Sequence, residues 1–303
     1  MATMTPSDGS VARDPTVAIV GAGRLGSVLA RALAGAGWRV VAVCDRDRAA
    51  ARALADRLGG VPVAPDAAAA LAAAGVVFLT VPDDALAPLA AALAAGPSVA
   101  GKIVFHTSGA LTAVVLAPLA AAGARAGTLH PLQTFADPAR GAECLTGVRW
   151  TGDGDVEAMA LGERLVRELG GRLLRVPAAG RVLYHAAAVV ASNGLVALAG
   201  QAERLLAAAG VAPEEALGAL LPLMRSTLEN LGRGSAAQAL TGPVVRGDVD
   251  TVRRHLAALA ESGRPDAADF YRALGRACLE LAAARGLDPG RVAELDRLLA
   301  DAG

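Results

Sequence analysis

The chain of 303 residues has few aromatic side chains, few cysteines and no excess of either charge. Phe, Trp and Tyr make up 3% of the sequence, which disfavours a site built from stacked rings. The three cysteines lie far apart, so they predict neither a disulfide framework nor a metal site, and a reducing, cytoplasmic compartment fits them. Lys plus Arg and Asp plus Glu both number 29. This zero net charge gives no reason to expect nucleic acid or an anionic membrane as a partner.

Apolar residues make up 54% of the chain, and alanine, the best helix former, supplies many of them. The most apolar long segment, residues 182–200, carries no formal charge. It contains Tyr184, His185, Ser192 and Asn193, which are costly in lipid, so we expect a buried helix of a soluble protein and no membrane span. Residues 1–14 lack the apolar stretch of a signal peptide, and we expect a disordered lead there.

Short β-rich runs alternate with helical runs in the first part of the chain. This alternation predicts βαβ units, and therefore an α/β Rossmann domain with a mostly parallel, doubly wound sheet over residues 15–178. The predicted strands are 16–20, 38–44, 75–81, 102–108, 124–131, 147–152 and 171–176. The predicted helices are 24–37, 48–60, 111–122, 155–169 and one that Pro82 opens.

The pattern changes after Pro177, where no further strand is predicted. Helical segments take over, and Gly and Pro residues separate them. The sequence therefore predicts an all-α domain over residues 179–303, with helices at 180–209, 213–232, 249–262, 265–286 and 289–302.

A glycine-rich loop follows the first predicted strand and opens a helix. It reads Gly21, Ala22, Gly23, Arg24, Leu25 and Gly26, the pattern G-x-G-x-x-G. In this context the pattern predicts a dinucleotide site, because the helix start offers free N–H groups to the pyrophosphate. Asp45 closes the next strand and is suited to the ribose 2′-hydroxyl of NAD(H), whereas Arg46 and Arg48 are suited to the 2′-phosphate of NADP(H). The sequence leaves this choice open.

Polar residues also follow the later strands, where open α/β sheets bind ligands. Val81, Pro82 and Asp83 end the third strand and are candidates for cofactor contact, although Pro82 and Asp83 would equally suit a helix start. His106 and Ser108 end the fourth strand, and Ser108 would equally suit a helix cap. His130 stands where the fifth strand stops.

Six motifs together resemble a family of Rossmann-like oxidoreductases whose C-terminal helical domain is catalogued as a domain of unknown function. These motifs are "VAIVGAGRLG", "FLTVPDDAL", "VFHTSGAL", "GTLHPLQTF", "LYHAAAVVASN" and "ALTGPVVRGD". The resemblance covers about residues 16–300 and places the chain in the broad group of 6-phosphogluconate dehydrogenase-like enzymes. It implies NADP(H) as cofactor, a homodimer through the helical domain, and ketopantoate reductase-like activity that reduces 2-dehydropantoate to pantoate.

The resemblance also implies roles for single residues. Prephenate dehydrogenases are similar in having a serine and a His-Pro pair that contact the oxygen at the reacting carbon, which here implies Ser108 and His130. Ketopantoate reductases use a lysine and asparagines on the helix that opens the second domain. This chain differs, because it has Arg181, His185 and Asn193 there and no lysine.

Hydride transfer to a C=O or C=N carbon also needs a proton donor. A histidine titrates near neutral pH, so His130 and His185 are the candidates for a general acid. Helical spacing predicts that Ser192 and Asn193 lie on the face of His185. In the loop 239–248, Thr241 and Arg246 are candidates for substrate binding, although the loop would equally suit a helix stop followed by a helix cap.

Three functions follow from these residues. The first is a reductase of a small 2-oxo acid or imine. The second is a deazaflavin-linked or flavin-linked NADP reductase, which the scarcity of aromatic residues disfavours. The third is a non-catalytic NAD(P) sensor, which would tolerate loss of His130 and His185.

Overall fold

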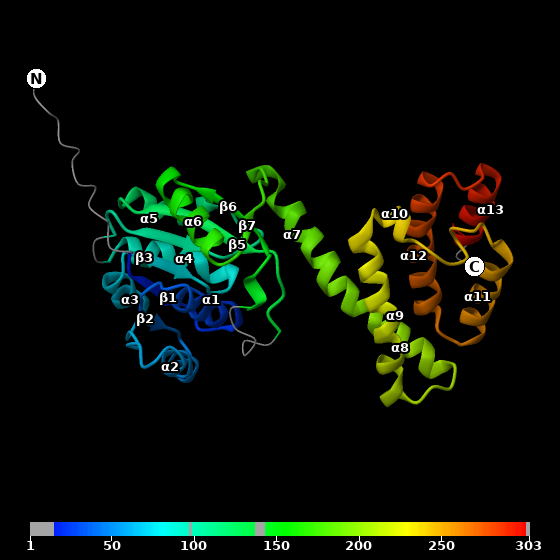
Figure 1. The fold of residues 1–303 in the computed structure, drawn as a ribbon, viewed down its shortest axis with the longest axis horizontal. Coiled ribbons are helices and arrows are strands. Elements are labelled where there is room, and N and C mark those ends of the chain that lie inside the picture. Colours follow the sequence, from blue (N-terminus) through cyan, green and yellow to red (C-terminus); the bar gives the residue numbers. More distant parts are fainter. Residues whose placement is uncertain (1–14, 97–98, 137–142, 301–303) are drawn as a thin grey trace, which may run out of the picture. The chain divides into compact units, whose positions relative to one another are not determined.

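The computed structural model describes residues 15–96, 99–136 and 143–300, and the expected lead at residues 1–14 lies outside them. Contacts divide the chain into two units, of which the first ends at Ser192 and the second begins at Asn193. The first unit holds the sheet with its helices, and the second is helical (Figure 1).

The first unit is built on a seven-stranded sheet in the order β2-β1-β3-β4-β5-β6-β7. Strands β1 to β5 are parallel, whereas β6 pairs antiparallel with β5 and β7 runs parallel to β6. The predicted mostly parallel Rossmann sheet is therefore confirmed. The strands are β1 Val17–Val20, β2 Val40–Cys44, β3 Val76–Leu79, β4 Ile103–His106, β5 Arg125–Pro131, β6 Arg149–Gly154 and β7 Arg172–Leu173.

Both faces of this sheet are covered, because successive strand residues point to opposite sides. Val17 and Ile19 of β1 belong to one core cluster, and Ala18 and Val20 belong to the other. The first cluster includes residues of α1 (Arg24–Gly35), α2 (Arg48–Arg57) and α6 (Val156–Glu168). The second includes residues of α3 (Ala67–Ala73), α4 (Asp83–Ala94) and α5 (Ala117–Ala121). This burial on both faces explains why the strands are apolar without alternation.

Some local elements differ from the predicted ones. Helix α3 was not predicted, although Asp66 marks its start by accepting a hydrogen bond from the Ala69 N–H. The predicted helix 111–122 is a 3₁₀ turn, Ala113–Leu116, followed by the short α5. The last predicted strand is reduced to the two residues of β7.

Helices make up the rest of the chain, as predicted. Val252, Leu256, Leu279, Leu295 and Leu299 form part of the core of the second unit. The short α10 was not predicted, and its start at Ser235 is a capping box with Gln238. The helices are α7 Arg181–Val189, α8 Leu195–Ala208, α9 Pro213–Arg233, α10 Ala236–Ala239, α11 Val249–Glu261, α12 Pro265–Ala284 and α13 Pro289–Ala300.

The apolar segment 182–200 forms a helix, but contrary to the expectation most of it is not buried within the single chain. Leu183 and Val190 are 75% and 72% exposed. The continuous helix Ala178–Ala208 is long and apolar enough to cross a membrane by length and composition alone, and its most apolar window has no buried residue. Between α7 and α8 the helix widens into a π-helical turn, Val190–Gly194.

Candidate active site

The glycine loop packs tightly against the end of β3. Gly21 has a φ of +111°, and a Cβ there would lie 2.5 Å from the carbonyl oxygen of Thr80. A Cβ on Gly26 would lie 1.9 Å from the carbonyl oxygen of Gly21. The Thr80 hydroxyl holds the loop in place by donating to that same carbonyl oxygen at 2.6 Å. These two glycines are therefore required by the fold itself.

Gly23 is different, because a Cβ on this residue would have no atom within 4 Å. It is the N-cap of α1, and no side chain caps the N–H groups of that helix. Open space over a helix start with free N–H groups is what a pyrophosphate needs. A cavity of about 540 Å³ lies beside the loop, and a dinucleotide fits this set of residues. The lining includes Gly21, Gly23, Cys44, Asp45, Arg46, Asp66, Thr80, Val81 and Pro82.

Asp45 already has partners inside the chain. One carboxylate oxygen accepts from the Ala22 N–H at 2.6 Å, and the other accepts from the Asp47 N–H at 2.8 Å. The Ala22 N–H is therefore engaged by the protein. Arg46 is exposed and lines the cavity, which leaves its guanidinium accessible to an anionic group.

Ser108 links the cofactor cavity to the end of β4. Its hydroxyl donates to Asp83 Oδ2 at 2.8 Å, and Asp83 directly follows Pro82 of the cavity wall. The Ser108 oxygen in turn accepts from the N–H groups of Ala110 and Leu111. The hydroxyl thus fixes the loop after β4 next to the loop after β3.

His106 supports this loop from inside the fold. Its side chain is fully buried, Nδ1 accepts from the Ser108 N–H at 3.2 Å, and Nε2 donates to the Thr112 carbonyl oxygen at 3.1 Å. Burial lowers the pKa of His106, in agreement with this neutral tautomer. With both nitrogens engaged and no exposed surface, the ring is placed to shape the loop and not to contact a cofactor.

His130 and His185 meet at Gly109. Their ring centroids lie 6.3 Å apart. A Cβ on Gly109 would lie 2.9 Å from Nε2 of His130 and 2.6 Å from Nδ1 of His185. Both nitrogens therefore converge on one point that only glycine leaves free.

The two histidines differ in their partners. His130 Nδ1 is 2.9 Å from the hydroxyl of Tyr184. His185 Nδ1 is buried and has no hydrogen-bond partner among the described residues. A buried polar atom without a partner costs about 1–3 kcal/mol, so His185 is ready to accept a partner that is not part of the chain.

His130 is neutral at pH 7. Burial, together with the nearby charges of Arg181 and the neighbouring histidines, lowers its pKa to about 4. The expectation that this side chain titrates near neutral pH does not hold in the folded protein. A neutral imidazole still carries one N–H, so His130 keeps a proton to donate.

Arg181 anchors the start of α7 beneath the histidines. It is 1% exposed, and its guanidinium donates to Thr151 Oγ1 at 2.6 Å and to the Ser108 carbonyl oxygen at 3.1 Å. Its Nε lies 3.9 Å from Asp153 Oδ2 of β6. One buried cation therefore joins β6, the loop after β4 and the helix that carries Tyr184 and His185.

Four predicted site residues are not brought to this cluster by the described contacts. Ser192 and Asn193 lie in the π-helical turn, which interrupts the 3.6-residue spacing on which their prediction rested. Thr241 and Arg246 belong to the second unit. There Asp248 caps α11 by accepting from the Thr251 N–H. The loop therefore contains the helix cap that was the alternative to substrate binding.

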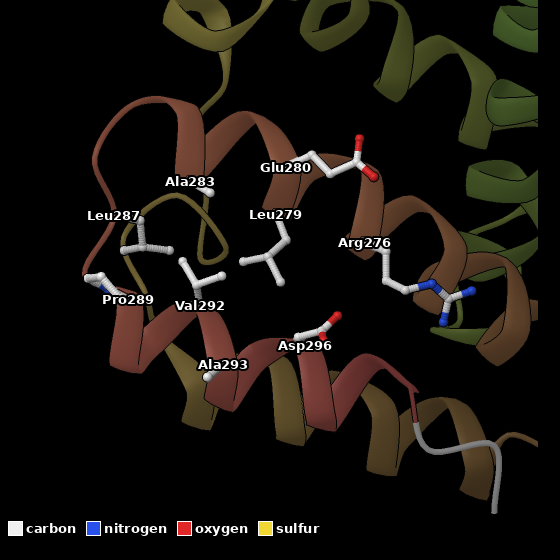
Figure 2. A pocket seen from close by; sticks show the side chains of 9 residues that line it. All are labelled: Arg276, Leu279, Glu280, Ala283, Leu287, Pro289, Val292, Ala293 and Asp296. Atoms are coloured by element: carbon white, nitrogen blue, oxygen red, sulfur yellow. The ribbon is translucent and has the colours of Figure 1, made fainter.

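The second unit has hollows of its own. Figure 2 shows one of about 510 Å³ between α12 and α13, where Leu279 and Val292 point toward one another. Its nine lining residues include neither His nor Cys and none of the predicted site residues. A second hollow, of about 450 Å³, is lined by residues that include Thr241.

Sequence reasoning missed five residues of the first unit. Thr80 and Gly109 act through close contact, which leaves no pattern in the sequence. Arg181 and Tyr184 were visible on the helix of His185, but their partner Thr151 comes from the antiparallel β6. A pairing between distant segments of this kind has no local signal.

Two families match consecutive parts of the chain. Residues 3–131 match the family described as Rossmann-like domain, and residues 148–278 match the one described as Domain of unknown function (DUF2520). The chain carries a Rossmann-like domain followed by this domain of unknown function. No curated protein matches it. Membership of the Rossmann-like domain in the 6-phosphogluconate dehydrogenase-like group stays a prediction.

Solved structures resemble both parts together. A Bacteroides fragilis protein provisionally described as an NADP oxidoreductase is 25% identical, with a TM-score of 0.71 over 88% of this chain and 98% of that chain. A Thermotoga maritima protein is also 25% identical, with a TM-score of 0.67 over 89% and 99%. A reductive aminase from Aspergillus terreus, in complex with NADPH and ethyl levulinate, is 21% identical with a TM-score of 0.60 over 95% and 93%. The aminase supports the fold alone.

Proposed function

We propose that the protein is an NADP(H)-dependent reductase of the C=O or C=N bond of a small carboxylate. One observation carries this proposal. The open helix start at Gly23 and the histidine pair at Gly109 belong to the same unit. The Ser108–Asp83 hydrogen bond links the loop of Gly109 to the loop after β3, and Thr80 in that loop donates to the glycine loop at Gly21. A dinucleotide site next to convergent proton-bearing groups is what a hydride-transferring enzyme requires.

The cofactor preference rests on the partners of Asp45 and Arg46. The Asp45 carboxylate is held by two backbone N–H groups, whereas the Arg46 guanidinium is accessible at the cavity. An accessible arginine favours a 2′-phosphate, and so does the similarity to the Bacteroides fragilis protein. We expect Arg46→Ala to weaken NADPH binding at least about tenfold and NADH binding little, as measured by calorimetric titration.

Each residue of the site has a defined task in this mechanism. NADPH, which Gly23 and Arg46 would hold, would supply a hydride to the electrophilic carbon. His130 offers its remaining N–H to the oxygen or nitrogen that gains negative charge. His185 Nδ1, which has no partner among the described residues, fixes a polar group of the substrate. Ser108 and Arg181 keep the loop with Gly109 in place. The histidine pair thereby orients the substrate and supplies the proton.

The substrate itself is open to experiment, and 2-dehydropantoate is the specific candidate implied by the resemblance to ketopantoate reductases. The test is oxidation of NADPH and NADH in the presence of 2-dehydropantoate, other 2-oxo acids and cyclic imines, with identification of the reduced product. We expect turnover of at least one of these compounds with NADPH. Tight NADPH binding without turnover of any of them would instead favour the non-catalytic sensor.

A further inference from the structure

Arg181 fixes the direction of a chain of hydrogen bonds in the first unit. A guanidinium can only donate, and its Nη1 lies 2.6 Å from Thr151 Oγ1. The Thr151 oxygen therefore acts as an acceptor toward Arg181. Its single hydrogen is left for another partner.

That partner is Tyr184. The Thr151 hydroxyl lies beside the phenolic oxygen of Tyr184 and lowers the pKa of that phenol, and a hydroxyl whose oxygen accepts from Arg181 keeps its hydrogen to offer to this neighbour. The phenolic hydrogen then has one acceptor among the described contacts, His130 Nδ1 at 2.9 Å. The two rings are nearly perpendicular, at 88°. The direction of donation therefore runs from Arg181 to Thr151, Tyr184 and His130.

This direction determines the tautomer of His130. Because Nδ1 accepts, the one ring hydrogen of the neutral imidazole stands on Nε2. Nε2 is the atom that faces Gly109 beside the unpartnered Nδ1 of His185. The hydrogen thus points to the place where the substrate is expected.

We propose that Arg181, Thr151 and Tyr184 hold His130 as the Nε2–H tautomer, and that the proton given to the substrate is replaced at Nδ1 by the proton of Tyr184. The second part rests on the proposed reductase function. Tyr184 acts through His130 and is a positioning and relay residue. The neutral His130 then carries its hydrogen on the nitrogen that faces the substrate, so it can donate a proton without first becoming an imidazolium.

The step is balanced in atoms and charge. A hydride from the dihydronicotinamide reaches the substrate carbon, and the N–H bond at His130 Nε2 breaks as the new O–H or N–H bond of the product forms. The O–H bond of Tyr184 breaks as an N–H bond forms at His130 Nδ1. The negative charge ends on the phenolic oxygen. After product release Nε2 takes a proton from solvent and the proton on Nδ1 returns to Tyr184, which restores the starting tautomer.

The surroundings of Tyr184 suit this temporary charge. The Arg181 guanidinium carbon lies 5.8 Å from the centre of the Tyr184 ring, and the Thr151 hydroxyl lies beside the phenolic oxygen. Burial raises the pKa of Tyr184, whereas Thr151 and Arg181 oppose that rise. The phenol is therefore protonated at rest, and the neighbours that would stabilise the phenolate are already in position.

The tautomer is measured directly by ¹⁵N NMR of the full-length protein labelled at histidine, which has four histidines. We expect His130 as pure Nε2–H in the wild type, and a mixture of tautomers in Tyr184→Phe and Thr151→Val. Thr151→Ser, which keeps the hydroxyl, is expected to restore the wild-type state. His130→Asn assigns the signal, and thermal unfolding checks that each variant is folded.

The chain offers a matched control in the second unit. His255 Nδ1 lies 2.7 Å from the hydroxyl of Tyr271, with rings at 87°. Tyr271→Phe is expected to change the His255 signal and to leave His130 unaffected. A wild-type His130 that carries its hydrogen on Nδ1, or an Nε2–H signal that persists in both Tyr184→Phe and Thr151→Val, would overturn the proposed chain. The NMR experiment needs no substrate, so it tests the tautomer of His130 even if the protein proves not to be a reductase.

The relay is tested by kinetics with a compound that the wild type reduces. Tyr184→Phe is expected to lower kcat at least about tenfold with an unchanged Kd for NADPH, and to shift the pH profile of kcat. An unchanged kcat and pH profile would reject Tyr184 as the proton source. Wild-type protein that reduces none of the compounds would reject the reductase function itself, and with it the relay.

Discussion

At the scale of single residues, the three glycines of the dinucleotide loop have different reasons to be glycine. A Cβ on Gly21 or Gly26 would collide with atoms of the chain, whereas a Cβ on Gly23 would meet no described atom within 4 Å. We therefore expect Gly23→Val to leave the unfolding temperature nearly unchanged and to abolish NADPH binding, because the new side chain would occupy the space over the helix start. The measurements are thermal unfolding and calorimetric titration.

Gly35 provides the matched control for that substitution. It lies at the exposed end of the same helix, α1, and a Cβ there also has no atom within 4 Å. Gly35→Val should therefore bind NADPH like the wild type. If Gly23→Val also binds normally, the pyrophosphate does not pass over this loop.

A second prediction for a single residue concerns acid. The pKa of His130 is about 4 in the folded protein, below its ordinary value of 6.5. The unfolded chain therefore binds this proton more readily, so the stabilising effect of a neutral His130 is complete above pH 6.5 and is lost as the pH falls toward 4. The loss is at most about 3 kcal/mol. Urea unfolding across this range should show a smaller loss for His130→Asn, and equal losses would contradict the assignment.

The glycine loop and the histidines at the strand ends were predictable because their signals are local. A strand, a glycine pattern and a helix follow one another in the sequence, and parallel strands bring their carboxyl ends to one edge. The protonation state of His130 was not predictable, because it depends on burial and on Arg181, which is 51 positions away in the chain. Gly109 likewise acquires its importance only when two distant histidines converge on it.

At the scale of elements, Arg181 fixes the start of α7 to β6 and to the loop after β4. Replacing this buried cation by leucine would leave Asp153 and the hydrogen-bond acceptors Thr151 and the Ser108 carbonyl without their partner. We expect Arg181→Leu to lower the free energy of unfolding by about 3–5 kcal/mol. The exposed Arg175 is the control, and Arg175→Leu should change it by no more than about 0.5 kcal/mol in chemical unfolding. Similar values for both variants would remove Arg181 from this role.

The long helix shows where periodicity is informative and where it is not. The apolar run predicted the helix itself, because hydrophobicity and alanine content suffice for that. The π-helical turn Val190–Gly194 was not predicted. It changes the spacing of the backbone hydrogen bonds, but no residue type in the sequence signals that change. The face of Ser192 and Asn193 could therefore not be derived from their distance to His185.

At the scale of the whole molecule, the exposed helix Ala178–Ala208 needs a partner. Its first turn is fixed in the sheet unit by Arg181 and Tyr184, and Glu203 is charged. The uncharged stretch 182–202 would span about 31 Å, close to the roughly 30 Å of a bilayer core, but it carries His185, Ser192, Asn193 and Gln201, which are costly in lipid. We therefore propose that a second copy of the chain covers this helix, as the resemblance also implies.

Sedimentation analysis tests this proposal. We expect a wild-type dimer and a monomer for the double variant Val190→Glu, Val196→Glu, whose sites are each 72% exposed. Val156→Glu, at a position that is 84% exposed on α6, should remain dimeric. A wild-type protein that is monomeric, or that floats with lipid vesicles, would contradict the proposed dimer.

The central claim is that the dinucleotide and the histidine pair serve one reaction, and the rate of NADPH oxidation in His130→Gln and His185→Gln tests it most directly. With a compound that the wild type reduces, the account predicts a kcat lower by about 10²–10⁴-fold for His130→Gln and a clear loss for His185→Gln, at an unchanged Kd for NADPH. Wild-type rates in both variants would contradict it.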